Sequence, residues 1–239
     1  MKNFIGLLVE KFGQPYSEIL GIDLESGRDE EIFKWFFASV LFGAPISETS
    51  VIKTFKTFKA HNVLTPKRIM ETGWDGLVGI LDEGGYTRYD FKTSDKLLEV
   101  MGNLESRYDG SLNTLHSQAS DFEDLEKRLK DLGKGIGDIT ISIFLRELRD
   151  LWEKADPNPT PLVVLAARSL GVIRDEEMPR EILERLKEIW RQNEIPRKTF
   201  VNFETSLLRV GKGFCRKRRC GTCPFMSYCL SYSKSMKTL

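Results

Sequence analysis

Four cysteines near the C-terminal end constrain this chain more than any other feature. Cys215, Cys220, Cys223 and Cys229 form the pattern C-x4-C-x2-C-x5-C, and no cysteine precedes them. In a chain without an export signal, cysteines this close together indicate metal ligands before disulfides. Sets of thiolates select iron-sulfur clusters or zinc. Zinc knuckles usually pair their ligands as two C-x2-4-C couples, which this loop matches less well, so we expect a [4Fe-4S] cluster, with zinc as the alternative.

The cysteine loop is also the most basic part of the chain. The formal net charge of the whole protein is only +1, so attraction to phosphate has to come from a local patch. Either metal centre would order the loop and present its basic side chains to a nucleic acid. Five such residues lie close together: Lys212, Arg216, Lys217, Arg218 and Arg219.

Apolar residues recur at helical spacing along almost the whole chain, and strict alternation is rare. Glycines and prolines separate the periodic stretches, so the pattern predicts an all-α protein. We find no internal repeat or low-complexity tract. Helices are expected at residues 29–42, 47–60, 66–72, 74–82, 91–108, 121–131, 138–153, 160–170, 178–192 and 197–210.

The size of the chain allows one large core or two small ones, with 239 residues of which 41% are hydrophobic. We expect two lobes: a central lobe at 30–132, and a second lobe from 1–29 and 133–239 that includes the cysteine loop at 211–230. No stretch approaches the roughly 20 apolar residues of a membrane span, and the first residues meet charge too early for a signal peptide. We therefore expect a cytoplasmic, nucleoid-associated protein, or a nuclear one in a eukaryote.

Three glycines join two helical patterns in the segment LGKGIGDIT at 132–140. Glycines at 135 and 137 bring backbone N–H groups close to a phosphate, and Ile136 between them can fill the core beneath the turn. Such a hairpin would hold a DNA backbone without reading its sequence. The alternative is a glycine helix cap in an ordinary helical hairpin. The residues expected to contact DNA here are Gly133, Lys134, Gly135, Gly137 and Thr140.

A candidate catalytic carboxylate, Asp156, lies 19 residues after Gly137 and directly before a proline-rich segment. A carboxylate there can face DNA that the hairpin holds. It would stabilise positive charge on a deoxyribose as a base departs, or deprotonate an attacking water. The alternative is that Asp156 only caps the helix that follows, a common use of aspartate.

With hairpin, aspartate and cysteine loop in this order, the chain resembles the helix-hairpin-helix DNA glycosylase superfamily, in its endonuclease III and adenine glycosylase branch. Members show a hairpin of the form L-P-G-V-G-x-K-T-A, an aspartate some way after it and a C-x6-C-x2-C-x5-C iron-sulfur loop. The resemblance covers roughly residues 29–229. It implies a bilobal all-α monomer that flips a damaged or mispaired base from double-stranded DNA and hydrolyses its N-glycosidic bond.

Weaker similarities lie upstream. The segment VLFGAP at 40–45 resembles the family's L-L-S-A-Q segment, and GGY at 84–86 resembles its G-x-Y turn. The resemblance implies that these segments approach the flipped nucleotide, although a tyrosine after two glycines also fits a turn packed on the core. The four tryptophans are candidates for base stacking, but their helical patterns favour the core. The implied pocket residues are Pro45, Tyr86, Arg88 and Ile139.

Several departures from the family pattern bear on the chemistry. Ile139 stands where bifunctional members keep a lysine nucleophile, which implies a monofunctional glycosylase with little or no lyase activity. Lys134 and Lys154 are the neighbouring amines that could substitute. Pro45 replaces the family's glutamine, and the first cysteine gap is two residues shorter than usual.

Two other functions fit the same sequence. A non-catalytic DNA-binding iron-sulfur protein of the same fold would keep the hairpin and the metal loop. A helical zinc protein that meets another protein would need neither DNA nor catalysis. The sequence leaves the lesion open among alkylated purines, oxidised pyrimidines, deaminated bases and mismatched thymine.

Overall fold

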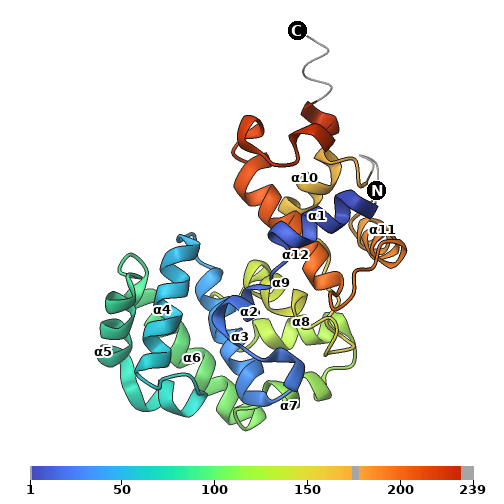
Figure 1. Ribbon diagram of the computed structural model, residues 1–239. Helices are drawn as coiled ribbons and strands as arrows, with labels where there is room; N and C mark the ends of the chain where they lie inside the picture. The colour runs from blue at the N-terminus through green and yellow to red at the C-terminus, as the bar shows by residue number, and fades with distance from the viewer. Residues whose placement is uncertain (1, 174–177, 233–239) are drawn as a thin grey trace. The chain divides into compact units, whose positions relative to one another are not determined.

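The computed structural model describes residues 2–173 and 178–232. In these two stretches the chain forms twelve α-helices with short helical turns between them and no β-strand, which confirms the predicted all-α class (Figure 1). The described helices include none that is both long enough and apolar enough to cross a membrane. The chain divides into two compact units, one of residues 16–157 and one of residues 1–15 with 158–239.

The unit of residues 16–157 contains α2 to α9, and the unit made from both chain ends contains α1 and α10 to α12. The bounds in the first unit are α2 (Tyr16–Leu20), α3 (Asp29–Phe42), α4 (Glu48–Ala60), α5 (Pro66–Gly84), α6 (Asp90–Tyr108), α7 (Leu112–Gln118), α8 (Phe122–Lys130) and α9 (Asp138–Arg146), with the turn η1 (Leu24–Ser26). Those in the second are α1 (Lys2–Phe12), α10 (Pro161–Ser169), α11 (Pro179–Gln192), α12 (Phe200–Val210), η2 (Gly211–Cys215), η3 (Cys220–Thr222) and η4 (Met226–Tyr228).

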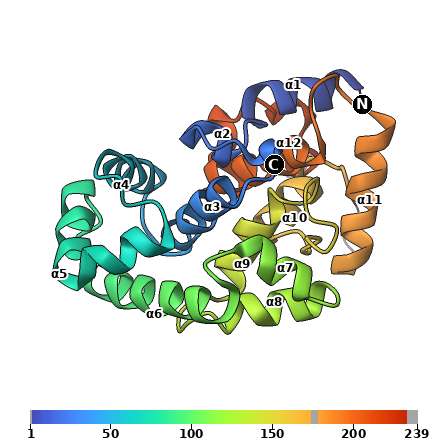
Figure 2. The same ribbon diagram turned by 90° about the horizontal axis from the view of Figure 1, so that it is seen from below.

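Aromatic side chains of α3 form the centre of the unit 16–157. Trp35, Phe36 and Phe37 are fully buried, because α3 is apolar on almost every face. The ring of Phe36 meets Phe144 of α9 edge-on at 5.1 Å, and the Trp35 indole N–H donates to the Phe144 carbonyl at 3.0 Å. These contacts fix α9 against α3. Helices α4, α5 and α6 follow one another at one end of this unit (Figure 2).

The other unit is built around α12, which packs on α1 and α10. Phe203 is fully buried and stacks on Trp190 at 5.9 Å. The Asn202 side-chain amide donates to the Gly13 carbonyl at 2.9 Å, tying α12 to the end of α1. At the other end of α12, a β-carbon at Gly211 would clash with the Leu162 carbonyl, so glycine permits the close approach that positions the start of the cysteine loop.

Most predicted helices match observed ones within a few residues. The break expected between 66–72 and 74–82 is confirmed, since Gly73 inside α5 has φ +68°. The helix predicted at 138–153 ends at Arg146 instead. Beyond that point the side chain of Glu147 accepts the N–H groups of Tyr16 and Ser17, each at 3.0 Å, and the backbone continues in turns. Helices α1, α2 and α7 are not among those expected.

The two units also divide the chain at different places from those expected. The boundaries fall at 15/16 and 157/158, whereas the expected lobes meet at 29/30 and 132/133. Packing of α9 on α3 is the physical reason, because it joins the hairpin to the central helices. The glycine hairpin and Asp156 therefore share one unit, and the cysteine loop belongs to the other.

Candidate functional site

The glycine hairpin at 131–137 is a well-packed turn between α8 and α9. Leu132 and Ile136 are buried, so Ile136 fills the core beneath the turn as expected. The Ile136 N–H donates to the Gly133 carbonyl at 3.2 Å. Gly135 has φ +91°, a conformation that favours glycine. Gly137 is extended and exposed, with open space where a β-carbon would be.

Helix α6 supports the hairpin through side chains on one face. Asn103 donates to the Leu132 carbonyl at 2.8 Å, and Arg107 donates to the Asp131 carbonyl at 2.9 Å. A β-carbon at Gly133 would lie 2.7 Å from a methyl group of Val100, so glycine is needed for this close packing. The turn is therefore held in one conformation by the protein itself.

The first turn of α9 presents a mixed surface. Ile139 is 66% exposed, which is unusual for a large apolar side chain. Lys134 and Asp138 are exposed as well. Thr140, however, is buried, and its hydroxyl occupies the space beside Gly43 at the end of α3. The Thr140 side chain is therefore not available to DNA, and the predicted DNA contact at this residue would have to come from its backbone.

The contact between Gly43 and Thr140 brings two predicted pocket segments together. Pro45, two residues after Gly43, is exposed, and Ile139 precedes Thr140. The segments that carry Pro45 and Ile139 thus meet at the junction of α3 and α9. Figure 2 shows these two helices side by side within the unit.

A carboxylate lies among the groups expected to meet phosphate. Asp138 forms an ion pair with Lys130 of α8 at 2.7 Å. The hydrogen bond to Lys130 lowers the pKa of the exposed Asp138 carboxyl, and the same bond raises the pKa of Lys130. The negative charge of Asp138 is therefore partly neutralised, but it stands at the start of the hairpin helix.

Tyr86 lies in the core of the unit 16–157. Its side chain is fully buried, and its hydroxyl donates to the Leu41 carbonyl at 2.6 Å. Burial raises the pKa of the phenol. The expectation that Tyr86 faces the flipped base is wrong, and its alternative, a turn packed on the core, is what the structure shows. Arg88 is exposed, with its guanidinium 5.5 Å from the Tyr89 ring centre.

Asp156 is held by an arginine that the sequence pattern did not single out. Arg149 donates to the Asp156 carboxylate and to the Pro157 carbonyl. The Arg149 side chain is 5% exposed and that of Asp156 is 23% exposed, so the carboxylate keeps some access to solvent. The residue that caps α10 is Thr160, so Asp156 does not cap this helix.

The two amines considered as substitutes for the missing nucleophile differ in their surroundings. Lys154 donates to the His116 carbonyl at 3.1 Å and lies 3.9 Å from Glu153. Lys134 is exposed on the hairpin. The Lys154 amine is therefore already engaged by a backbone carbonyl, whereas that of Lys134 lies on the surface.

The tryptophans follow the expectation with one exception. Trp35, Trp152 and Trp190 are buried. Trp74 is 38% exposed, and its ring lies 5.2 Å from that of the exposed Phe91. Its indole N–H donates to Asp95 at 2.8 Å.

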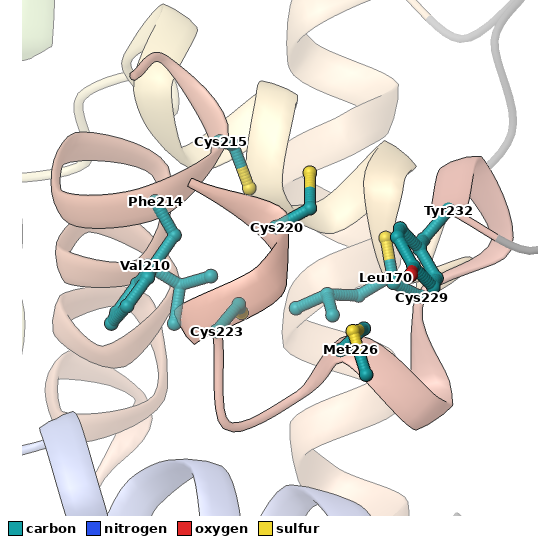
Figure 3. Close-up of a pocket in the computed structure, with 9 residues that line it drawn as sticks. All are labelled: Leu170, Val210, Phe214, Cys215, Cys220, Cys223, Met226, Cys229 and Tyr232. Carbon is teal, nitrogen blue, oxygen red and sulfur yellow. The ribbon is translucent and has the colours of Figure 1, made fainter. Parts of the chain in front are cut away.

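The four cysteines line a single pocket in the unit made from both chain ends (Figure 3). No disulfide joins them. Within the described residues, no three or more His, Cys, Asp or Glu side chains are placed as ligands of a single metal ion. The remaining lining is largely apolar: Leu170, Val210, Phe214, Met226 and Tyr232.

Burial disfavours the charged form of two of these thiols, Cys215 and Cys223. Burial, with a smaller contribution from the other cysteines, raises the pKa of Cys215 to about 11. Burial also raises the pKa of Cys223. The Cys229 thiol donates to the Ser169 carbonyl at 3.3 Å. Four cysteines around one pocket are a donor set that could hold an iron-sulfur cluster or zinc, whose positive charge would stabilise the thiolate form of Cys215 and Cys223.

The basic residues of the cysteine loop are mostly on the surface, and their contact with phosphate stays a prediction. Arg216, Lys217, Arg218 and Arg219 are all exposed, and Lys212 is half-buried. Arg218 has φ +52°, so the chain turns sharply within this run.

No protein-family model and no curated protein matches the chain.

Proposed function

We propose that the protein is a DNA glycosylase of the helix-hairpin-helix type, which flips a damaged or mispaired base from double-stranded DNA and hydrolyses its N-glycosidic bond. One observation carries the proposal. A partly exposed carboxylate, Asp156, is fixed by Arg149 in the same unit as a glycine hairpin whose backbone is held in one conformation by α6. Hydrolysis of an N-glycosidic bond in DNA needs both of these parts: a segment that binds the DNA backbone and an oriented carboxylate.

The hairpin would bind one phosphate group through backbone N–H groups around Gly135 and Gly137. Open space surrounds Gly137, and the side chain of Lys96 lies beside Gly135. The base next to this phosphate leaves the stack at a cost of a few kcal/mol, and damaged or mispaired bases cost least. The segments around Pro45 and Ile139 would then meet the extruded nucleotide. A proline and an isoleucine offer apolar contact there.

Asp156 would act on the sugar. As the bond between C1′ and the base breaks, positive charge develops on the deoxyribose, and the nearby carboxylate stabilises it. The departing base keeps the electron pair of the broken bond and takes a proton from solvent. A water attacks C1′ and gives its proton to Asp156, which leaves an abasic site and a free base. Ile139 has no amine for a covalent step, so the strand stays intact.

The cysteine loop would hold a [4Fe-4S] cluster through Cys215, Cys220, Cys223 and Cys229. When bound, this cluster supplies the cross-link that orders the loop. The loop's own contribution is the exposed run of basic residues at 216–219, which would contact DNA phosphates. The partner is double-stranded DNA, and we propose a monomer.

A panel of duplexes, each with one lesion or mismatch, tests the proposal when every reaction is assayed with and without alkali. Alkali cleaves abasic sites, so strand breaks that appear only after alkali identify a monofunctional glycosylase and its substrate. Asp156→Asn should reduce base release at least about 100-fold and leave DNA binding nearly intact. Asp150→Asn, which changes an exposed aspartate nearby, is the matched control. Base release that is equal in the two variants would contradict the catalytic assignment.

The ion pair with Arg149 also supports a second function, a DNA-binding protein of this fold without catalysis. An arginine beside Asp156 reduces the negative potential that the carboxylate offers to a cationic sugar. Tight DNA binding without product from any duplex in the panel would favour this function. Analysis of iron and labile sulfide separates both from a helical zinc protein.

A further inference from the structure

A lysine on α6 completes the face of this helix that contacts the hairpin. Asn103 and Arg107 bind the carbonyls of Leu132 and Asp131, and Val100 packs on Gly133. Residues at this spacing lie on one face of a helix. Lys96 is one turn before Val100 on the same face, at the end nearest Gly135.

Lys96 crosses the space that a side chain at Gly135 would fill. A β-carbon at Gly135 would lie 2.8 Å from Cε of Lys96 and 3.3 Å from its Nζ. Gly135 also has φ +91°. Glycine is therefore favoured at this position for two reasons: it adopts the positive φ, and it leaves room for the Lys96 side chain. The result is an ammonium group placed directly on the backbone of the hairpin.

This ammonium group has no counter-ion. Among the described residues, Lys96 makes no hydrogen bond or ion pair, unlike Lys130, which binds Asp138 and Glu126. Burial lowers the pKa of Lys96, and no carboxylate offsets that effect. Glu99, on the next turn, packs its side chain on Gly133. A half-buried cation without a partner is costly, and an anion beside it would relieve the cost.

We propose that Lys96 binds the DNA phosphate that the hairpin holds, and that its ammonium neutralises this phosphate while the backbone N–H groups orient it. The inference rests on the proposed function, because it assigns a ligand to the same hairpin. It differs from the sequence-based assignment, in which Lys134 is the lysine of this site. Lys134 projects from the turn, whereas Lys96 lies against its backbone.

The experiment compares the wild-type holoprotein with Lys96→Met, Lys96→Arg and Lys92→Met. Lys92 is exposed on the same helix, so Lys92→Met removes the same charge without touching the hairpin. The probe is a fluorescent duplex with a tetrahydrofuran abasic-site analogue, and its dissociation constant is measured by anisotropy at several salt concentrations. One lost phosphate contact lowers the slope of log K against log salt by about 0.9.

For Lys96→Met we expect this loss of slope, so that its affinity deficit relative to wild type shrinks about threefold between roughly 50 and 200 mM salt. Lys96→Arg should keep the wild-type slope, and Lys92→Met should change it by less than half as much. A purely structural role for Lys96 would lower affinity without changing the slope. If Lys96→Met fails to fold, Lys96→Gln takes its place in the same titration.

Three results would overturn the inference. The first is an equal slope in Lys96→Met and Lys92→Met, which leaves the proposed function intact. The second is a covalent adduct with DNA that borohydride traps in the wild type but not in Lys96→Met, because it would make Lys96 a nucleophile toward C1′. The third is no DNA binding by the wild type, which also removes the proposed function.

Discussion

The glycine hairpin and the cysteine loop are both short connecting segments, but they are ordered by different means. The hairpin buries Leu132 and Ile136, and its carbonyls accept hydrogen bonds from α6. In the cysteine loop, Phe225 is buried between Phe4 and Phe12, while most of the other residues between 216 and 230 are exposed. The comparison teaches that the hairpin is supported by protein contacts, whereas the loop has few of them, so under the proposed function it would depend on the metal centre that its thiols hold.

Loss of one cysteine should therefore have the largest effect, confined to the loop. Cys223→Ser is expected to lose iron and labile sulfide and to abolish protection from hydrogen exchange across 211–230, since metal binding and folding are coupled. The hairpin at 131–137 should keep its protection. Thr222→Ser, next to the ligand, serves as the control. Equal loss of protection in both segments would break the comparison.

A large effect on stability is also expected from the ion pair between Arg149 and Asp156, which lies in the same unit as the hairpin. Arg149→Leu removes the arginine that donates to the Asp156 carboxylate and should lower the free energy of unfolding by about 3 kcal/mol. The double variant Arg149→Leu with Asp156→Leu should recover part of this loss, because it also removes the half-buried negative charge. Urea unfolding followed by circular dichroism measures both. A double variant that is less stable than the single one would show that the pair is not the main interaction.

The stability of the hairpin should depend on its backbone conformation rather than on a bound cofactor. Gly135→Ala meets both a positive φ and the side chain of Lys96, and should cost about 1–2 kcal/mol of stability. Gly137→Ala, with φ −111° and open space around it, should change stability by less than about 0.5 kcal/mol. Thermal unfolding of the two variants distinguishes them. Similar melting temperatures would mean that the turn is not constrained at Gly135.

The smallest predicted effect concerns the negative charge of Asp138 at the start of α9. Asp138→Asn removes an exposed carboxylate from the expected phosphate site and should tighten DNA binding a few-fold at low salt. The gain should fade as salt rises, because the repulsion that it removes is screened. Asp150→Asn provides a control of equal charge away from the hairpin. Weaker binding by Asp138→Asn would show that its bond to Lys130 matters more than its charge.

Features that depend on local sequence were predictable, and those that depend on distant contacts were not. Gly73 breaks α5 and Ile136 is buried because neighbouring residues dictate both. The cysteine spacing likewise indicated a shared pocket. Tyr86, by contrast, is buried through its bond to Leu41, 45 residues away, which no local pattern reveals.

The same reason explains what the sequence pattern missed at the candidate site. Arg149 is one of several arginines after the hairpin, and only the turn after α9 brings it to Asp156. Lys96 is 39 residues before Gly135 in the chain, and the missing side chain at Gly135 was its single local signal. Thr140 looked exposed on the hairpin pattern but packs beside Gly43.

Helix α9 joins the two halves of the candidate site and therefore sets the distance between them. It starts at the hairpin, has nine residues and ends at Arg146, three residues before Arg149. Nine residues advance about 13 Å along a helix axis, and each residue turns the chain by about 100°. Adding or deleting one residue in α9 would rotate Arg149 and Asp156 relative to the hairpin, and so away from the DNA that we propose it holds. In homologous proteins, the length of this helix should therefore vary less than its surface residues.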